Sequence, residues 1–300
     1  MKKKKQKTSA TSIKTLESRL YRRMDIMVAT LCLLGIVAGG IGIYASGADY
    51  RQAEEEYDKL GKYVQATSQK EGVELSLKEE GEIETEITDQ MFDIDWESLR
   101  TINPEIVGWI VIEDTPVHYP IVQTVDNAKY LHTSFEGTDN SCGTIFLDTY
   151  NHSDFSDWNS LIYGHNMKNG SMFAVLNKYK DEQFYMEHKD IWLLTPYWER
   201  KYQIISAHPA QDGSETYSIM FTGETYRSHI ANEVSQSSYD TGNSYNTELP
   251  MITLSTCTGR GLLDRFVLIC QPVYETKLNP FIEDTGDVSE ENVEITEESH

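Results

Sequence analysis

The stretch that decides the fold reads Thr253-Leu254-Ser255-Thr256-Cys257-Thr258, and after a short glycine-rich turn it continues as Arg265-Phe266-Val267-Leu268-Ile269. Each half is apolar and rich in β-branched residues, which predicts two adjacent strands. Cys257 ends the first strand and Arg265 opens the second, so a thiol and a guanidinium lie at neighbouring strand ends. A thiolate is a nucleophile, and an arginine beside it stabilises an oxyanion on an attacked carbonyl. The pair is therefore a candidate catalytic site.

By itself, a lone cysteine at a strand end is more often a small buried hydrophobe, and an arginine that opens a strand is usually solvated. A third residue favours the catalytic interpretation. The segment Leu161-Ile162-Tyr163-Gly164-His165-Asn166-Met167 is another short apolar run, and it ends on a histidine that follows a glycine. Of the eight histidines, only His165 has this setting. The sequence thus predicts a cysteine, a histidine and an arginine at three strand ends.

The chain resembles the class B sortases, which are membrane-anchored cysteine transpeptidases of Gram-positive bacteria. The resemblance rests on segments in the family's order between residues 92 and 274: Asn103-Pro104-Glu105-Ile106-Val107-Gly108-Trp109-Ile110, Asp126-Asn127 with Tyr130-Leu131, Tyr163-Gly164-His165-Asn166-Met167 running into Gly170-Ser171-Met172-Phe173, and Thr253-Leu254-Ser255-Thr256-Cys257 with Arg265. It implies that Cys257 is the nucleophile, that His165 is the acid/base, and that Arg265 binds substrate and stabilises the oxyanion. It also implies an eight-stranded sortase β-barrel with an N-terminal helical extension.

Short apolar runs separated by turn residues predict a mainly β domain with helical insertions. The eight predicted strands are 109–113, 117–123, 143–148, 160–164, 191–195, 201–207, 251–256 and 265–271. Eight strands can close a small barrel whose interior is filled by side chains. Helices are predicted at 95–102 with Asp95 as N-cap, at 126–132, at 171–179 and at about 218–233.

Charge is distributed unevenly along the chain. Residues 1–25 carry nine Lys or Arg and two acidic residues, a net charge of +7, so the remainder of a chain with a total of −22 carries −29. A net charge of −29 on residues 26–300 argues against nucleic-acid binding. Residues 26–44 contain no charge and, as a helix, span roughly 28 Å, about the thickness of a bilayer core. This predicts one transmembrane helix with a basic cytoplasmic tail at 1–25 and an extracellular body. A cleaved signal peptide is the alternative.

Three regions outside the membrane flank or adjoin the predicted catalytic domain, 92–274. Residues 48–66 have apolar side chains at three- and four-residue steps, which predicts an amphipathic stalk helix that packs on the domain or on lipid headgroups. Residues 67–91 are polar and acidic and are predicted to be a flexible spacer. Residues 275–300 hold nine Asp or Glu against one Lys, which predicts a disordered acidic tail.

The four cysteines lie in two predicted compartments, the membrane and the outside of the cell. Cys32 lies in the predicted membrane helix, which leaves Cys142, Cys257 and Cys270 outside. Since three is an odd number, at least one thiol stays unpaired, and Cys257 is the expected one. Cys142 and Cys270 form either a disulfide or two buried thiols, and buried thiols are favoured.

Substrate-binding residues are carried over by motif. The resemblance implies that Asn127, Leu131, Tyr163 and Ser255 contact the substrate, and the loop 208–219, with Tyr217, occupies the family's specificity region. Each has a structural alternative: Leu131 as core, Tyr163 as barrel packing, Ser255 as strand filler and Asn127 as a helix cap.

The function implied is cleavage of a surface protein's C-terminal sorting motif after its threonine, through a Cys257 thioester. An amine from peptidoglycan, a lipid II cross-bridge or a pilin lysine then resolves the thioester. The alternatives are a secreted cysteine protease, although the papain-type Cys-Gly-Ser-Cys-Trp context is missing, and a non-catalytic surface or pilus-assembly scaffold. No cofactor and no metal site are expected, since the chain has no EF-hand-type loop.

Overall fold

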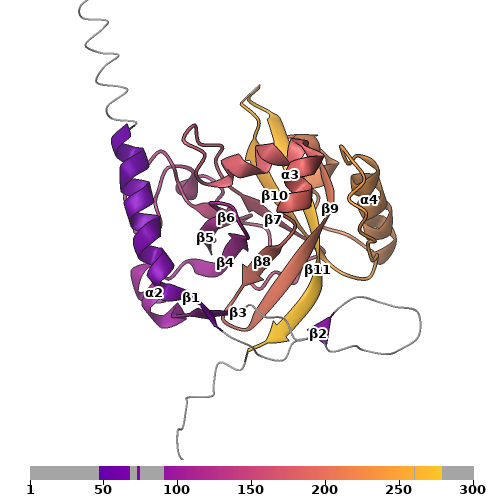
Figure 1. Ribbon diagram of the computed structural model, residues 1–300. Coiled ribbons are helices and arrows are strands. Elements are labelled where there is room, and N and C mark those ends of the chain that lie inside the picture. The colour runs from indigo at the N-terminus through magenta and orange to yellow at the C-terminus, as the bar shows by residue number, and fades with distance from the viewer. Residues whose placement is uncertain (1–46, 68–72, 75–90, 260, 279–300) are drawn as a thin grey trace, which may run out of the picture. The chain divides into compact units, whose positions relative to one another are not determined.

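The computed structural model describes residues 47–67, 73–74, 91–259 and 261–278. Eight strands form a closed barrel (Figure 1). They are β4 (Ile106–Ile112), β5 (His118–Val122), β6 (Ile145–Leu147), β7 (Asn159–Tyr163), β8 (Ile191–Leu194), β9 (Trp198–Gln211), β10 (Met251–Cys257) and β11 (Asp264–Lys277). The order around the barrel is β10-β7-β6-β5-β4-β8-β9-β11, and pairing of β10 with β11 closes it. Each of the eight predicted strands is present.

Two of these pairings set the geometry of the candidate site. β10 runs parallel to β7, and it runs antiparallel to β11. The strands that carry Cys257, His165 and Arg265 are therefore neighbours, and the three strand ends predicted from the sequence meet at one end of the barrel.

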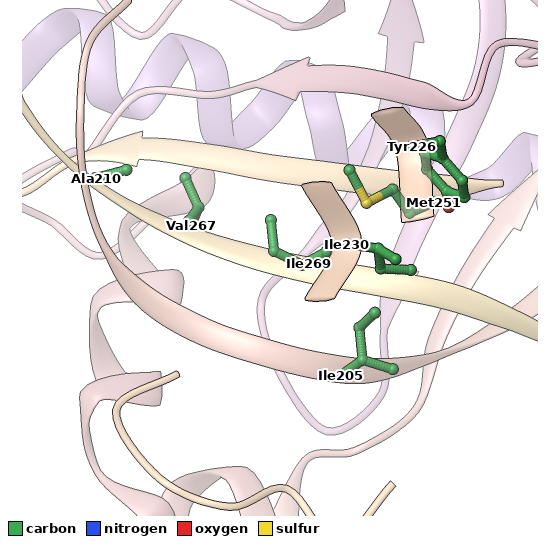
Figure 2. Close-up of a cluster of buried hydrophobic side chains, with 7 residues drawn as sticks. All are labelled: Ile205, Ala210, Tyr226, Ile230, Met251, Val267 and Ile269. Carbon is green, nitrogen blue, oxygen red and sulfur yellow. The ribbon is translucent and has the colours of Figure 1, made fainter. Parts of the chain in front are cut away.

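The central parts of β9, β10 and β11 are buried on both faces because a helix covers their outer side. This helix, α4 (Gly223–Ser235), begins with a capping box between Thr222 and Thr225. Its apolar face packs against the sheet in the cluster drawn in Figure 2. The members of the cluster are Ile205, Ala210, Tyr226, Ile230, Met251, Val267 and Ile269. Burial on two faces explains why these strands read as nearly continuous apolar runs.

The other helical segments agree in part with expectation. α2 (Trp96–Ile102) is capped by Asp95, whose carboxylate accepts the Ser98 amide, as predicted. The segments predicted at 126–132 and 171–179 are 3-10 helices, η2 (Lys129–Leu131) and η3 (Phe173–Lys180). The helix α3 (Glu182–Glu187) was not predicted, and α4 begins five residues later than expected.

The predicted helix at 48–66 is shorter than expected. Residues 47–60 are helical, and the chain continues as η1 (Gly61–Tyr63) and β1 (Val64–Thr67). β1 pairs with β3 (Met91–Ile94), so the β-branched Val64 lies opposite Ile94. In the strand, Val64 pairs with Ile94, and a helix continued through Val64 would lose this pairing. A β-branched residue such as Val64 also favours a strand over a helix.

The chain divides into two compact units, 1–54 and 55–300. Of the first, only the helical residues 47–54 are described. Within the second, the end of this helix is fixed to the loop before β6: Glu56 accepts the Glu136 amide at 2.8 Å, and the Tyr57 hydroxyl donates to the Gly143 carbonyl at 2.8 Å. The expected packing of the stalk helix on the domain is present in this part.

Several expectations concern residues that are only partly described. In the predicted spacer 67–91, Val73–Glu74 form β2, which pairs with β11 at Tyr274 and Glu275, while 68–72 and 75–90 lie outside the described residues. β11 runs to Lys277, three residues beyond the expected domain end. The predicted cytoplasmic tail, the membrane helix at 26–44 and the tail after 278 lie outside the described residues. In the described part, none of the helices has the length and apolar character to span a bilayer.

Candidate active site

A pocket of about 240 Å³ opens at the barrel end where β7, β10 and β11 meet. Its walls contain most of the residues predicted from the sequence, together with several that were not. The lining residues are Asn127, Leu131, Phe146, Tyr163, Gly164, His165, Asp212, Ser255, Thr256, Cys257 and Arg265.

Strand register brings Cys257 and His165 to the same place. β7 and β10 are parallel, and Ser255 lies beside Tyr163 at the end of their pairing. Cys257 and His165 each lie two residues further on, so both side chains point to the face on which Ser255 and Tyr163 lie. The Thr256 hydroxyl donates to the Gly164 carbonyl at 2.8 Å and holds the two chain ends together.

The glycine before the histidine is required by packing. A Cβ on Gly164 would lie 2.5 Å from Cδ1 of Ile145 and 2.6 Å from Cγ of Phe173. Any side chain here would therefore displace the core beneath His165. Gly164 is therefore needed because the backbone passes too close to the core for a side chain.

The imidazole of His165 is held by the main chain. Its Nε2 lies 2.7 Å from the Leu131 carbonyl oxygen, which accepts hydrogen bonds only. Nε2 therefore carries a proton, and Nδ1 is the ring nitrogen left to exchange protons in the pocket. The exposed ring of His132 stacks beside His165, with centroids 6.2 Å apart and planes at 26°. Leu131 thus orients the histidine as well as lining the pocket.

Cys257 is partly exposed and lies directly opposite Arg265 in the β10–β11 ladder. Side chains of directly opposed residues stand on the same face of an antiparallel pair, with Cβ atoms about 5 Å apart. Behind the cysteine, the Asn177 amide donates to the Cys257 carbonyl at 3.0 Å. The thiol is therefore presented to the pocket from a strand end that is fixed on both sides.

Arg265 is mostly buried and its guanidinium is held at two points. One terminal nitrogen, Nη2, lies 2.8 Å from an Asp212 carboxylate oxygen, and the other, Nη1, donates to the Leu262 carbonyl at 2.7 Å. The neighbouring Asp264 points elsewhere, as alternation along the strand predicts, and accepts the Gln211 side-chain amide at 2.7 Å. Sequence reasoning did not find Asp212.

One wall of the pocket is a polar cluster built on Asp148. This buried carboxylate accepts the Asn127 side-chain amide at 2.8 Å and the Tyr163 hydroxyl at 3.0 Å. The side-chain Oδ1 of Asn127 in turn accepts the Thr149 amide at 2.9 Å. Asn127 is therefore not a helix cap: the N-cap position of η2 is Ala128, and it is Asp126 whose carboxylate accepts the amides of Ala128 and Lys129 in the turn before it.

Tyr217 lies beside this wall and contacts a second predicted residue. Its hydroxyl lies 2.8 Å from Oγ of Ser255, and its ring stacks on Tyr163 with planes at 14°. Burial raises the pKa of Tyr217 to about 12, although the Ser255 hydrogen bond acts in the opposite sense. Burial and the nearby Asp148 carboxylate also raise the pKa of Tyr163. Both phenols are thus neutral hydrogen-bonding groups at physiological pH.

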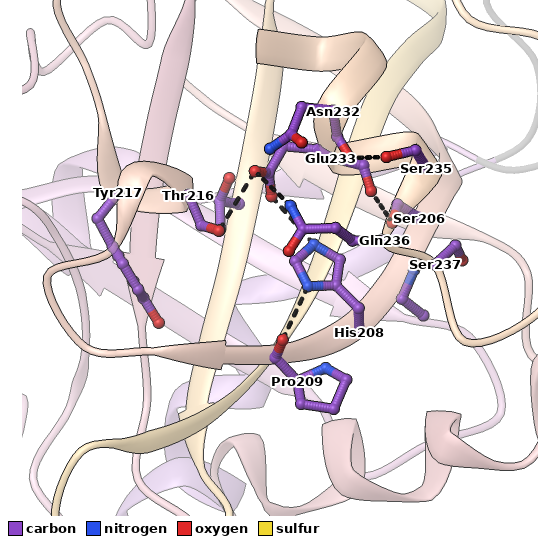
Figure 3. A network of polar contacts seen from close by, with 12 residues as sticks. Ser206, His208, Pro209, Thr216, Tyr217, Asn232, Glu233, Ser235, Gln236 and Ser237 are labelled. Carbon is purple, nitrogen blue, oxygen red and sulfur yellow. Dashed lines mark hydrogen bonds and ion pairs between the residues drawn. The ribbon is translucent and has the colours of Figure 1, made fainter.

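The 3-10 turn that carries Tyr217, η4 (Glu215–Tyr217), is tied to α4 by a buried polar network (Figure 3). Glu233 of α4 accepts the Thr216 hydroxyl at 3.3 Å and contacts His208 of β9 at 3.0 Å, and His208 reaches the Pro209 carbonyl at 3.0 Å through Nδ1. The carboxylate and the imidazole are almost fully buried. The turn is thereby fixed to the sheet and the helix.

The two remaining described cysteines, Cys142 and Cys270, are both thiols with buried side chains, as the sequence analysis favoured. Burial strongly raises the pKa of the Cys270 thiol. Cys257 is the only partly exposed thiol in the described part of the chain, as expected for the nucleophile.

Comparisons with known proteins show which family the chain resembles in sequence and fold. The family model for the sortase domain matches residues 110–273, more than half of the chain. Sortase B of Listeria monocytogenes is 34% identical over 173 residues, which cover 57% of this chain and 68% of the relative. The structure of sortase B from Bacillus anthracis in complex with AAEK1 has a TM-score of 0.61 and 28% identity, and covers 75% of this chain and 98% of that one. The sortase B–substrate complex of Staphylococcus aureus has a TM-score of 0.56 and 28% identity, over 61% of this chain and 85% of that one.

Proposed function

Because the chain belongs to the class B sortases, which are cysteine transpeptidases, we propose that it cleaves the C-terminal sorting motif of surface proteins after a threonine and transfers the acyl group to an amine. The acceptor is an amine of peptidoglycan or its lipid II precursor, or a pilin lysine. The observation that carries the proposal is the direct opposition of Cys257 and Arg265 in a pocket that His165 also lines.

In the first step, the Cys257 sulfur attacks the carbonyl carbon of the threonine. The carbonyl π electrons move to its oxygen, and the Arg265 guanidinium stabilises this oxyanion. As the intermediate collapses, the carbon–nitrogen bond breaks, and protonated His165 gives the Nδ1 proton to the leaving amine. The Leu131 carbonyl supports this role because it accepts a hydrogen bond from Nε2, so Nε2 keeps its proton throughout the reaction.

In the second step, an acceptor amine attacks the thioester carbon. Neutral His165 takes a proton from the amine at Nδ1, and the carbon–sulfur bond breaks to regenerate the Cys257 thiolate. The products are a new amide bond and the free enzyme. Water would give hydrolysis at the same carbon, so preference for an amine distinguishes a transpeptidase from a cysteine protease.

The substrate residues before the scissile bond bind against the wall formed by Asn127, Leu131, Tyr163 and Ser255, which Tyr217 supports through its contacts with Ser255 and Tyr163. These side chains offer amide, hydroxyl and phenol groups that are held by neighbours, such as Asp148 for Asn127 and Tyr217 for Ser255. Groups fixed in this way bind a peptide with little loss of side-chain entropy. The solved substrate complex of a related sortase B lends support to a peptide site in this fold.

The enzyme acts at the cell surface, anchored by one transmembrane helix at 26–44 with the N-terminus in the cytoplasm. The support is the +7 charge of residues 1–25 ahead of an uncharged segment of nineteen residues. Protease added to intact wall-stripped cells should digest the catalytic domain. Protection of the domain until the cells are lysed would contradict this topology.

The activity is tested with a peptide library, since the motif is unknown. Purified full-length protein is incubated with the library and with a primary amine such as triglycine, and the products are sequenced by mass spectrometry. Peptides cleaved after threonine and joined to the amine are expected from the wild type, and none from Cys257→Ala. Cleavage that is equally fast without amine and yields only free acids would favour the protease alternative.

A further inference from the structure

The side chains of Arg265 and Cys257 stand on the same face of the β10–β11 pair and line the same pocket. The Arg265 guanidinium, however, is restrained by hydrogen bonds. Nη2 contacts Asp212 and Nη1 contacts the Leu262 carbonyl, on two edges of the same plane. Among the described residues, none accepts a hydrogen bond from Nε. The contacts therefore restrain the plane of the guanidinium, and they leave the Nε–H without an acceptor among the described residues.

Asp212 is itself fixed by the strand that carries Arg265. It follows the last residue of β9, and in the β9–β11 ladder Arg265 lies opposite Ala210. The Asp212 amide donates to the Leu263 carbonyl at 2.8 Å, and the adjacent Gln211 donates to Asp264. Two hydrogen bonds thus join the end of β9 to the turn before β11. They fix the backbone from which the Asp212 carboxylate reaches Arg265.

The ion pair between Asp212 and Arg265 contributes little to the folding stability of the protein. Asp212 keeps 45% of its side-chain surface exposed, and pairs of this kind contribute little to folding because solvent screens them and both side chains lose freedom. Catalysis benefits more, because a donor aimed in advance at the developing oxyanion needs no reorganisation during the reaction. Asp212 also lines the pocket, although it is not one of the site residues predicted from the sequence.

We propose that Asp212 is a positioning residue of the transpeptidase, which holds the Arg265 guanidinium in the plane that meets the oxyanion. The inference rests on the proposed function of Cys257 and Arg265. Asp212 does not touch the reacting atoms in this account; it acts through Arg265.

The kinetic test compares Asp212→Asn, Asp212→Ala and Asp212→Glu in the full-length chain. The matched control is Asp190→Asn, because Asp190 forms an ion pair of 2.9 Å with Lys201, has a similar exposed fraction of 41% and does not line the pocket. Loss of orientation should lower kcat about tenfold in Asp212→Asn, with a smaller change in KM, since the oxyanion forms only in the transition state. Asp212→Glu should recover part of the loss, and all variants should keep the wild-type melting temperature.

A double-mutant cycle tests whether Asp212 acts through Arg265. Adding Asp212→Asn to Arg265→Ala should cause no further loss in the single-turnover rate of thioester formation, because the group that Asp212 holds is already gone. If the two substitutions reduce the rate by independent factors, Asp212 has some other role and the proposal is wrong.

A measurement without substrate separates this inference from the proposed function. The ¹⁵N relaxation of the Arg265 Nε–H signal, assigned by its disappearance in Arg265→Lys, should show a rigid side chain in the wild type and in Asp190→Asn, and a mobile one in Asp212→Asn. An unchanged signal in Asp212→Asn would overturn the proposal, as would a mobile arginine with wild-type kcat. A rigid wild-type arginine together with no amine-dependent product from any peptide would instead count against the proposed function alone.

Discussion

Cys257 and Arg265 lie directly opposite each other in the antiparallel pairing of β10 with β11, although eight residues of sequence separate them. The turn between the strands does not set this relationship by its length alone. Register does, because Thr253 to Cys257 pair in sequence with Ile269 to Arg265. A shift by one residue would put the guanidinium on the opposite face from the thiol. The pairing is therefore the structural basis of the candidate catalytic site.

Replacement of Cys257 by alanine should abolish turnover, since no other partly exposed thiol is present among the described residues to form the covalent intermediate. The free energy of unfolding should change by less than about 1 kcal/mol, because the side chain lies at a partly exposed strand end. Urea unfolding and the peptide assay measure the two effects. Residual amine-dependent turnover well above background would show that Cys257 is not the nucleophile.

Arg265→Lys should lower kcat by about a hundredfold, within the range measured for loss of one oxyanion donor. An ammonium keeps the positive charge, but it cannot bond Asp212 and Leu262 on two edges and also present an N–H to the oxyanion. The control is Arg227→Lys, which alters an exposed ion pair between Arg227 of α4 and Glu248. Wild-type kinetics in Arg265→Lys would assign the arginine a structural role.

Iodoacetamide at pH 8 should modify Cys257 in the folded protein and leave Cys142 and Cys270 unmodified. Both of these side chains are fully buried, and burial raises the pKa of the Cys270 thiol, so it stays protonated as well as shielded. Peptide mapping by mass spectrometry measures each site separately. All three should react after unfolding in guanidinium, and fast modification of Cys270 in the native state would contradict the packing described for β11.

Tyr217→Phe should raise KM about fivefold with little change in kcat, because Ser255 loses the hydrogen bond that holds its hydroxyl in place for the substrate, an effect of about 1 kcal/mol. Since the pKa of Tyr217 is raised to about 12, the phenol is neutral at every pH below about 11. The alkaline side of the pH–rate profile should therefore be the same in the wild type and in the variant. A profile that loses its alkaline limb in Tyr217→Phe would mean that the phenol titrates during catalysis.

The barrel could be predicted from the sequence because its signals are local. Each of the eight strands contains a short run of mostly apolar residues near turn residues. The N-cap of α2 is equally local, since Asp95 is three residues before Ser98, whose amide it accepts. Residues such as Cys257 and His165 stand at the ends of such runs. The short helix α3 gave no comparable signal, since six residues are too few to show a helical period.

Asp212 and Asp148 could not be found in this way because their roles depend on register and on long-range pairing. Asp212 reaches Arg265 across 53 residues only because β9 and β11 are neighbours with Ala210 opposite Arg265. Asp148 follows the last residue of β6, and its carboxylate accepts hydrogen bonds from the side chains of Asn127 and Tyr163. The strand β1 was missed inside the predicted helix at 48–66 for a similar reason, since Ile94, the strand partner of Val64, lies thirty residues away.

The most direct test of the account is detection of the acyl-enzyme. Full-length protein is mixed with the sorting peptide identified from the library, quenched in acid within seconds and analysed by intact mass and peptide mapping. The account predicts an adduct equal to the N-terminal part of the peptide, on Cys257, that disappears on addition of triglycine as the amide product appears. An adduct on another residue, or amide formation with no intermediate on Cys257 under any quench time, would contradict it.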